Sequence, residues 1–485
     1  MSYGEWEAVV GLEIHAQLNT VSKLFSSAPN RFGDEPNTNI SPVCTGHPGT
    51  LPILNKEAVK KAVLFGHAVN ADIALYSKFD RKSYFYPDCP RNFQITQFDK
   101  PIVVGGAITC MIEGQEKTMK LDHTHLEDDA GMCRHFSDFG GVDLNRAGVP
   151  LIEIVTKPLI GTNPKEVAAF ANMIRAILQY IDICDCNMEE GSLRMDCNIS
   201  VKKKGETSLR TKVEVKNMNS FSNMQLAVAQ EIKRQIKIYS ENPGKDPATL
   251  IAQSTLRWDP EAKMLRLMRQ KEQAEDYRYF PEPDLPPLVL TKEYVELIRK
   301  KMPELPFDRK KRYVEKIDIS DDIADILIAD KKLSDFFEEG LKTCSNARSL
   351  SNWIVVEFLG RFKDTGQELP TSKITPKNVA NLVNMIDQNV ITGKIAKSVA
   401  DDMVSMEGKD CHEIVTENPD YQPVNDQGEV EKLVDEVLSQ NQQSIEDYKN
   451  GKEKAFGFLV GQVMKVSRGK ASPSVVNELL KKKLS

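Results

Sequence analysis

Residues 121–158 read LDHTHLEDDAGMCRHFSDFGGVDLNRAGVPLIEIVTKP and begin with a dense group of ionisable side chains. Later in the segment, over residues 142–155, polar groups interrupt an otherwise apolar run. Ionisable groups this close together repel one another unless a positive charge lies among them. Two interpretations are open: a solvated acidic turn, or carboxylate and imidazole ligands gathered for a hard cation such as Mg²⁺. The group consists of Asp122, His123, His125, Glu127, Asp128 and Asp129.

A second segment, residues 9–18 (VVGLEIHAQL), alternates between apolar and polar side chains from Leu12 onward. Side chains on a β-strand repeat every two residues, so a strand here points Glu13 and His15 the same way, about 7 Å apart. An antiparallel strand with one solvated face explains the alternation but gives no reason for a carboxylate beside an imidazole. If this strand lies beside residues 121–158, a Glu, a His and an Asp converge on one cavity.

Two further segments, residues 193–201 and 209–217, alternate in the same way and predict two more strands. A half-solvated antiparallel sheet is the simpler interpretation of this pattern. Each segment places a row of polar groups on one face: Arg194, Asp196 and Asn198 on the first, and Arg210, Lys212, Glu214 and Lys216 on the second.

Helices are predicted between and after these strands. Asn163 suits a helix cap and Pro164 the first turn, and apolar residues then recur at helical spacing as far as Ile181. A long helix is predicted over residues 220–239. Residues 277–288 (YRYFPEPDLPPL) contain four prolines and cannot continue a helix, so we expect an extended segment that closes the first domain near its cavity.

The strand signal nearly disappears after residue 291, and short helical patterns separated by cap and turn signals take over. We therefore predict an α+β chain of three domains. Residues 1–291 form a cradle-like domain with a mixed, mainly antiparallel sheet, residues 292–407 a helical bundle, and residues 408–485 a small all-α tail domain.

The composition is that of an ordinary globular protein, with 40% hydrophobic and 28% charged residues among 485. No apolar run approaches the roughly 18 residues of a membrane span, and residues 1–10 lack the features of a signal peptide. We therefore expect no membrane association and a cytoplasmic location. The nine cysteines include no CxxC pair, which predicts reduced thiols and no disulfide framework.

The end of the chain carries local positive charge, although the net charge of the whole chain is −6. Residues 452–485 contain eight Lys or Arg against only Glu453 and Glu478. Basic helical segments in an acidic protein are typical of polyanion binding, whereas a solvated basic C-terminus is the plainer alternative.

Several common motifs are absent from the sequence. There is no GxxxxGK[ST] loop, so any ATP chemistry is not of the P-loop kind, and Gly140 and Gly141 lack the spacing of a dinucleotide fingerprint. There is no Ser/Lys-rich glutaminase signature and no convincing Cys nucleophile.

Long strings of this sequence resemble, in the same order, the signature segments of the GatB family, the B subunits of bacterial aspartyl/glutamyl-tRNA amidotransferases. With AFGFLVGQVMKVSRGKASPSVVNELLKKKL near the C-terminus, the resemblance covers essentially the whole chain. The other strings are VVGLEIHAQL, SKFDRKSYFYPDCPRNFQITQFDKPI, HLEDDAG, VDLNRAGVPLIEIV, MEEGSLRMDCNIS, KVEVKNMNSF and DYRYFPEPDLPPL.

The resemblance implies a two-step reaction. ATP phosphorylates the side-chain carboxylate of Glu-tRNA(Gln) or Asp-tRNA(Asn), and ammonia then displaces the phosphate. The ammonia comes from a partner A subunit with glutaminase activity, and a small C subunit completes a heterotrimer. A non-enzymatic tRNA-binding scaffold is the alternative. A stand-alone metal-dependent hydrolase is a third hypothesis, which the lack of an activated nucleophile disfavours.

The resemblance also implies a catalytic centre in which Mg²⁺ is held by Glu13, His15 and Asp128. Glu127 and Asp196 are the further metal ligands that it implies.

Other residues gain implied roles in binding the nucleotide and the tRNA. By residue type alone, Lys82 and Arg81 are either solvated charges or phosphate ligands. The resemblance favours phosphate contacts, above all for Lys82, and adds Glu214 as a candidate in the nucleotide cavity. In the tail, it implies tRNA contacts by Lys465, Arg468 and Lys470.

Overall fold

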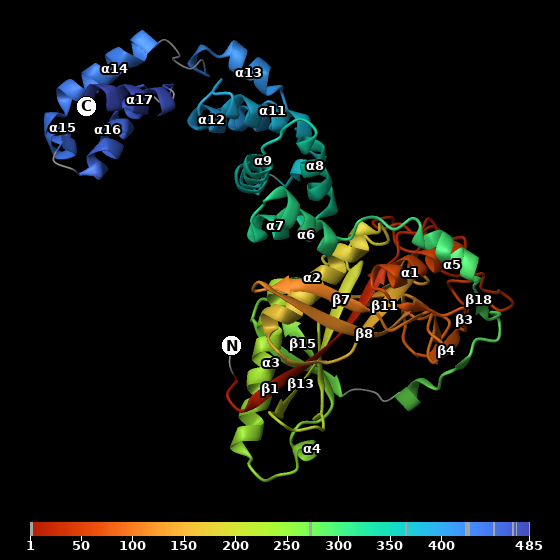
Figure 1. Ribbon diagram of the computed structural model, residues 1–485. Coiled ribbons are helices and arrows are strands. Elements are labelled where there is room, and N and C mark those ends of the chain that lie inside the picture. Colours follow the sequence, from red (N-terminus) through yellow and green to blue (C-terminus); the bar gives the residue numbers. More distant parts are fainter. Residues whose placement is uncertain are drawn as a thin grey trace. The chain divides into compact units, whose positions relative to one another are not determined.

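The computed structural model describes residues 3–270, 274–363, 366–421, 427–449, 452–467, 470–471 and 473–484. The chain divides into two compact units, Met1–Phe307 and Asp308–Ser485. The first is built around strands and the second from helices, which confirms the predicted α+β class (Figure 1). Helix α5 (Lys292–Arg299) belongs to the first unit, where the carbonyl oxygen of Val295 lies 3.0 Å from the ring of His67. The division into three domains stays a prediction.

One large sheet of eleven strands organises the first unit. All its neighbouring strands are antiparallel except β14 and β15, which are parallel. Two strands lie off the main path: β12 (Leu159–Thr162) pairs with β1, and β7 (Ala107–Ile112) pairs with β8. The main path runs through β16 (Met264–Gln270), β15 (Ser254–Asp259), β14 (Val213–Lys216), β13 (Leu193–Lys203), β1 (Trp6–Gln17), β11 (Pro150–Thr156), β8 (Gln115–Asp128), β6 (Val103–Val104) and β2 (Asp72–Ile73).

The strands predicted from alternation are found, with one shortened. β1 and β13 cover the predicted segments, but β14 begins only at Val213. Among the residues before it, Arg210 turns to Glu206, with Nη2 2.6 Å from Oε1, and stacks over the ring of Trp6. The acidic group at residues 122–128 is not a turn, because it forms the last part of β8.

The strand register aligns polar residues from different strands in rows across the sheet. His15 lies opposite Glu153 on β11 and opposite Arg194 on β13. Glu153 in turn lies opposite His125 on β8. Side chains directly opposite each other share one face of a sheet. The register therefore gathers these four groups on the same face.

Helices α2 (Pro164–Tyr180) and α3 (Phe221–Glu241) cover the other face of the sheet (Figure 1). The Nε2 amide of Gln235, on α3, donates a 3.0 Å hydrogen bond to the carbonyl oxygen of Ile199 on β13. Asn163 caps α2 as predicted, since its side chain accepts hydrogen bonds from the first-turn backbone. The alternate residues of β1, including Leu12 and Ile14, are buried. Because the helices cover this apolar face, Glu13 and His15 face the opposite side.

Two small sheets, β17-β4-β5 and β18-β3, hold the segment with four prolines against the rest of the first unit. β17 (Phe280–Pro281) pairs with β4 (Asp80–Ser83), which also pairs with β5 (Phe93–Thr96). The segment is extended, as predicted, and brings an aromatic stretch beside Arg81 and Lys82. The remaining elements of this unit are α1 (Lys56–Ala68), β3 (Tyr76–Ser77), β9 (Met132–His135), β10 (Gly140–Asp143), α4 (Pro247–Leu250), η1 (Ala274–Tyr277) and β18 (Leu288–Val289).

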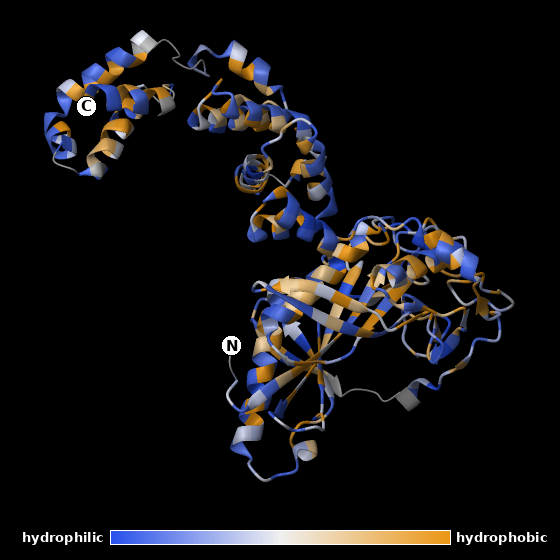
Figure 2. Ribbon diagram, viewed as in Figure 1, coloured by the Kyte–Doolittle hydropathy of each residue, from blue (hydrophilic) through white to orange (hydrophobic). Residues whose placement is uncertain are grey.

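The second unit consists of amphipathic helices, whose hydrophilic and hydrophobic residues alternate along the ribbon in Figure 2. In the tail, Val434, Leu459, Val463 and Leu480 are fully buried in one apolar cluster. The helices are α6 (Pro306–Ile317), α7 (Asp321–Ile328), α8 (Lys331–Leu341), α9 (Ala347–Asn352), the π-helix η2 (Trp353–Phe358), α10 (Leu359–Phe362), η3 (Leu369–Thr371), α11 (Pro376–Asp387), α12 (Gly393–Ser405), α13 (Cys411–Glu417), η4 (Pro419–Tyr421), α14 (Gln427–Gln440), α15 (Gln442–Lys449), α16 (Glu453–Val466) and α17 (Pro473–Leu484).

Two expectations from composition can be compared with the structure. Within the part of the chain that the structure describes, every helix is too short or too polar to cross a membrane. All nine cysteines are free, and eight of them are buried. The latter finding confirms the prediction of thiols without disulfides.

Candidate active site

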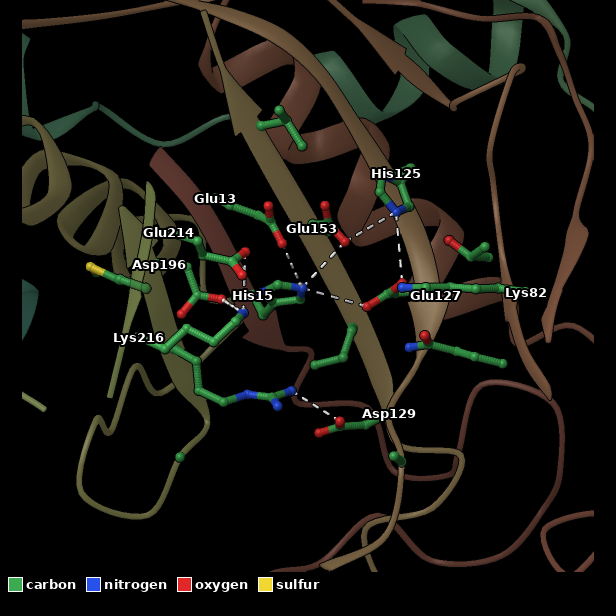
Figure 3. Close-up of a pocket in the computed structure, with 18 of the residues that line it drawn as sticks. Glu13, His15, Lys82, His125, Glu127, Asp129, Glu153, Asp196, Glu214 and Lys216 are labelled. Carbon is green, nitrogen blue, oxygen red and sulfur yellow. Dashed lines mark hydrogen bonds and ion pairs between the residues drawn. The ribbon is translucent and has the colours of Figure 1, made fainter. Parts of the chain in front are cut away.

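A cavity of about 950 Å³ lies over the polar face of the central sheet (Figure 3). Strands β1, β8, β11, β13 and β14 each contribute charged side chains to its wall. Lys82 enters from β4, and Tyr277 and Tyr279 border the same space. Strands that are far apart in the sequence thus present their charges to one volume.

The centre of the cavity is a cluster of two imidazoles and three carboxylates. His15 Nε2 lies 3.2 Å from Glu153 Oε2, 3.7 Å from Glu127 Oε1 and 3.9 Å from Glu13 Oε1. His125 Nε2 lies 3.4 Å from the same Glu153 oxygen and 3.8 Å from Glu127 Oε2. Glu153 is therefore shared between two imidazoles, and Figure 3 shows it between them.

The charges of this cluster depend on one another. Burial lowers the pKa of His15, but the nearby carboxylates of Glu153 and Glu127 outweigh it and raise the pKa to about 9. The pKa of His125 is also raised against the effect of burial, by the same two carboxylates. Burial raises the pKa of Glu153, yet the two imidazoles hold it well below its usual range. In the absence of another cation, protons on the imidazoles supply the positive charge.

Lys82 and Glu127 form the side of the cavity that faces β4. Burial lowers the pKa of Lys82, but Glu127 and other negative groups raise it above its usual range, so the ammonium stays charged. Glu127 is only 2% exposed, and its Oε2 has no hydrogen-bond partner among the described residues. A buried carboxylate oxygen without a partner is costly and invites a ligand.

The opposite side of the cavity carries carboxylates that already have a cation. Lys216 Nζ lies 2.5 Å from Asp196 Oδ2 and 3.5 Å from Glu214 Oε1. Thr255 Oγ1 donates a 2.8 Å hydrogen bond to the other oxygen of Glu214. Burial lowers the pKa of Lys216, but Asp196 and Glu214 raise it above its usual range. Asp196 and Glu214 thus line the cavity as expected, with a counter-ion of their own.

The structure places Asp128 outside this cavity, unlike the arrangement expected from the sequence. Neighbouring residues of a strand point to opposite faces, so Glu127 and Asp128 cannot both face the cavity. Asp128 instead accepts a hydrogen bond from the guanidinium of Arg91 and a 2.9 Å hydrogen bond from the backbone N–H of Ile95. Through these hydrogen bonds, the Asp128 side chain holds β5 and the preceding loop against β8.

Arg81 is also turned away from the cavity. Its guanidinium lies 2.7 Å from Glu282 Oε2 and 3.0 Å from Asp284 Oδ2, and it stacks over the ring of Phe93. Arg81 and Lys82 are adjacent on β4, so only one of them can reach the cavity. Arg81 therefore fixes the segment with four prolines, and Lys82 alone faces the acidic cluster.

Asp129, the last member of the acidic group, borders the cavity as part of an ion-pair network. Arg194 Nη2 lies 2.9 Å from its Oδ1, and the amide of Gln17 donates a 2.9 Å hydrogen bond to its Oδ2. Burial raises its pKa, but Arg194 and Arg146 hold the pKa below its usual range. Asp129 ties the ends of β1, β8 and β13 together.

Sequence reasoning missed two residues at the centre of the site. Glu153 is the only charged residue in the apolar strand PLIEIVT, and this interruption is the signal that could have identified it. His125 belongs to the acidic group but is not among the site residues expected from the sequence. Strand parity with Glu127 would have placed it on the same face.

The tail residues expected to contact tRNA differ in their surroundings. Lys465 is exposed near the end of α16. Lys470 is partly buried, with Nζ 2.8 Å from Asp420 Oδ1. Arg468 lies outside the described residues.

The donor groups of the cavity fit a hard divalent cation. Glu13, His15 and Asp196 form one group whose ligand atoms lie within 4.8 Å of one another, and His15, Glu127 and Glu153 form a second. Carboxylate oxygens supplemented by an imidazole suit Mg²⁺ or Mn²⁺. The unpartnered oxygen of Glu127 also favours such a cation, whose charge would replace that of the protonated imidazoles.

Comparison with known protein families identifies two domains in the chain. Residues 8–296 match the GatB/GatE catalytic domain, and residues 335–484 match the GatB domain. The first match spans the large sheet and the cavity, and the second spans most of the helical unit.

Curated relatives identify the family more narrowly. A protein of Protochlamydia amoebophila (strain UWE25) is 62% identical, covering 100% of this chain and 98% of the relative. Proteins of Chlamydia pneumoniae and Chlamydia abortus are 59% and 57% identical, and each covers at least 99% of this chain. All three are named as the B subunit of aspartyl/glutamyl-tRNA(Asn/Gln) amidotransferase. The chain belongs to the GatB family.

Proposed function

We propose that this chain is the subunit of a glutamine-dependent amidotransferase that converts Glu-tRNA(Gln), Asp-tRNA(Asn) or both into their amides. The names of its relatives support a role in this reaction. The observation that carries the proposal is the convergence of Glu13, His15, Glu127, Glu153 and Lys82 on one cavity. This charge pattern suits the transfer of a phosphoryl group, in which negative charge must be held and oriented.

The proposed reaction has two steps. An oxygen of the substrate carboxylate forms a bond to the γ-phosphorus of ATP as the bond to ADP breaks, which gives an acyl phosphate. Ammonia then forms a bond to the acyl carbon, the bond to phosphate breaks, and a proton is lost from nitrogen. The permanently charged Lys82 is positioned to pair with a phosphoryl or carboxylate oxygen in both steps.

A divalent cation belongs to this proposal. Either of two groups that share His15 would hold Mg²⁺: Glu13, His15 and Asp196, or His15, Glu127 and Glu153. When bound, the ion would supply positive charge to the phosphoryl oxygens. Asp128, which is engaged with Arg91, is not part of either group.

The ammonia must come from a partner. Among the described residues that line the cavity there is no Cys or Ser, the usual nucleophiles for glutamine hydrolysis. We therefore propose a heterotrimer with an A subunit that releases ammonia from glutamine and a small C subunit. The complex would act on tRNA in the cytoplasm.

The tail is the proposed second contact with tRNA. Lys465 is exposed on α16, and Lys470 is held by Asp420 near the same end of this helix. Basic side chains of this kind bind phosphates with a strong dependence on salt.

The test is ATP-dependent formation of Gln-tRNA(Gln) by the assembled enzyme with Glu127→Gln. We expect a loss of at least about 100-fold in kcat, because a carboxylate that would hold the divalent cation beside the phosphoryl group is removed. Glu116→Gln, an exposed position on the same strand, is the matched control and should retain activity. If Glu127→Gln were as active as the wild type, the cavity would not be the reaction centre and the scaffold hypothesis would take its place.

A further inference from the structure

One side of the cavity is bordered by aromatic residues that the reaction scheme above does not use. They come from the loops after β4 and after β5 and from the segment that leads into β17. We call them the aromatic rim: Tyr84, Phe85, Tyr86, Phe98, Tyr277 and Tyr279.

The rim runs from inside the cavity to the surface. Tyr84, Phe98, Tyr277 and Tyr279 line the cavity, whereas Phe85 lies outside its lining and is 65% exposed. Pairing of β4 with both β17 and β5 holds the three contributing segments side by side. The rings therefore form a path toward the acidic cluster.

The rings are arranged for stacking, and one of them has an open face. Phe98 and Tyr279 stack with ring centroids 4.2 Å apart and planes inclined by 11°. Phe98 nevertheless remains 54% exposed, so the stack ends in an aromatic surface open to solvent. Exposed aromatic rings grouped beside a cavity are typical of a binding surface.

Cations accompany the rings along the same path. Arg278 lies over the ring of Phe85, with its Cζ 5.2 Å from the centroid, and Lys82 lies 5.0 Å from the centroid of Tyr277. Arg278 has a left-handed backbone, with φ of 47°, between the two tyrosines. Such a conformation in a residue with a side chain persists only where the surrounding structure imposes it. Aromatic rings interleaved with cations are typical of surfaces that bind single-stranded nucleic acid.

We propose that the aromatic rim stacks the unpaired nucleotides at the 3′ end of the tRNA substrate, with Phe98 and Tyr279 holding the base nearest the reacting carboxylate. The inference rests on the proposed function and adds where the RNA strand enters. The adenine of ATP is the competing occupant of the rings in the cavity. A single base, however, would leave Phe85 and Arg278 outside the cavity unused, whereas a strand of several nucleotides covers them.

The experiment measures KM for Glu-tRNA(Gln) and KM for ATP in the assembled enzyme with Phe98→Ala. Removing one stacking ring should raise KM for the tRNA roughly tenfold, with KM for ATP unchanged. Phe98→Tyr keeps the ring and should raise KM for the tRNA far less than Phe98→Ala does. Phe98→Leu keeps apolar bulk without an aromatic face, and should resemble Phe98→Ala.

Phe85→Ala distinguishes an effect on RNA binding from an effect on ATP binding, because this residue lies outside the cavity. We expect a smaller rise in KM for the tRNA than with Phe98→Ala, and weaker binding of a fluorescent tetranucleotide that ends in CCA. A rise in KM for ATP alone with Phe98→Ala would assign the rings to the nucleotide and overturn the proposal. Unchanged KM for both substrates would also overturn it. Both results require an active wild type, whereas a wild type unable to amidate tRNA would refute the proposed function itself.

Discussion

The carboxylates on the two sides of the cavity have different partners. On the side of β13 and β14, Asp196 and Glu214 are paired with Lys216 and Thr255. On the side of β8 and β11, two histidines share Glu153, and the described residues leave Glu127 Oε2 without a hydrogen bond.

The difference indicates which side is built to receive a ligand. In an ion pair such as Asp196–Lys216, the protein itself already supplies the opposite charge, so the need for a bound cation is smaller. A carboxylate cluster that relies on protonated imidazoles can exchange those protons for a metal ion. We therefore expect the β8 and β11 side to hold the reacting groups and the β13 and β14 side to serve mainly as their support.

The largest effect should come from Glu153→Gln, which removes the charge shared by His15 and His125. We expect kcat for tRNA amidation to fall about 100-fold, because both imidazoles lose the partner that orients them. Glu214→Gln is the matched control on the other side, and its loss should be about tenfold or less, since Thr255 and Lys216 remain around it. Equal losses of kcat in the two variants would contradict the proposed difference between the two sides.

An intermediate effect is expected from Lys216→Met, and it should appear in stability. Asp196 and Glu214 would remain buried without their cation, which should lower the free energy of unfolding by about 1–3 kcal/mol. Urea unfolding of the full-length chain measures this change, with Lys120→Met at an exposed position of β8 as control. A stability equal to that of the control would mean that the pair is not needed for folding.

The smallest effect is expected in the stabilisation that metal binding gives to the folded chain. Mg²⁺ at about ten times its Kd should add about 1.4 kcal/mol to the stability of the folded chain, and raise Tm by roughly 1–2 °C. Glu127→Gln should lose this increase and Glu214→Gln should keep it. If only Glu214→Gln abolished the increase, the metal would lie on the opposite side.

The sequence was most informative where strand periodicity was clean. The alternation from Leu12 placed Glu13 and His15 on one face, and that of residues 193–201 added Asp196. The reason is local: in a sheet with one apolar face, the period of two decides which side chains meet. The α+β class and the capped helix α2 followed from equally local signals.

The same rule, applied to residues 121–128, separates Glu127 from Asp128. The resemblance implied Asp128 as a ligand, but adjacent strand residues diverge and Asp128 meets Arg91 instead. The sequence alone does not state which partner Lys216 or Arg81 selects, because those ion pairs join segments far apart in the chain. The ion pairs of the cavity therefore become evident only in the folded structure.

The direct alignment of His15, Glu153 and His125 across three strands limits how the chain can change in length. Adding or deleting one residue within β11 would reverse the direction of every later side chain, sending Glu153 into the apolar layer and an isoleucine into the cavity. An indel there would thus remove the chemistry and disturb the packing together. The hairpin turn between β9 and β10, whose Phe136 and Phe139 are both exposed, is free of that constraint and can absorb variation in length.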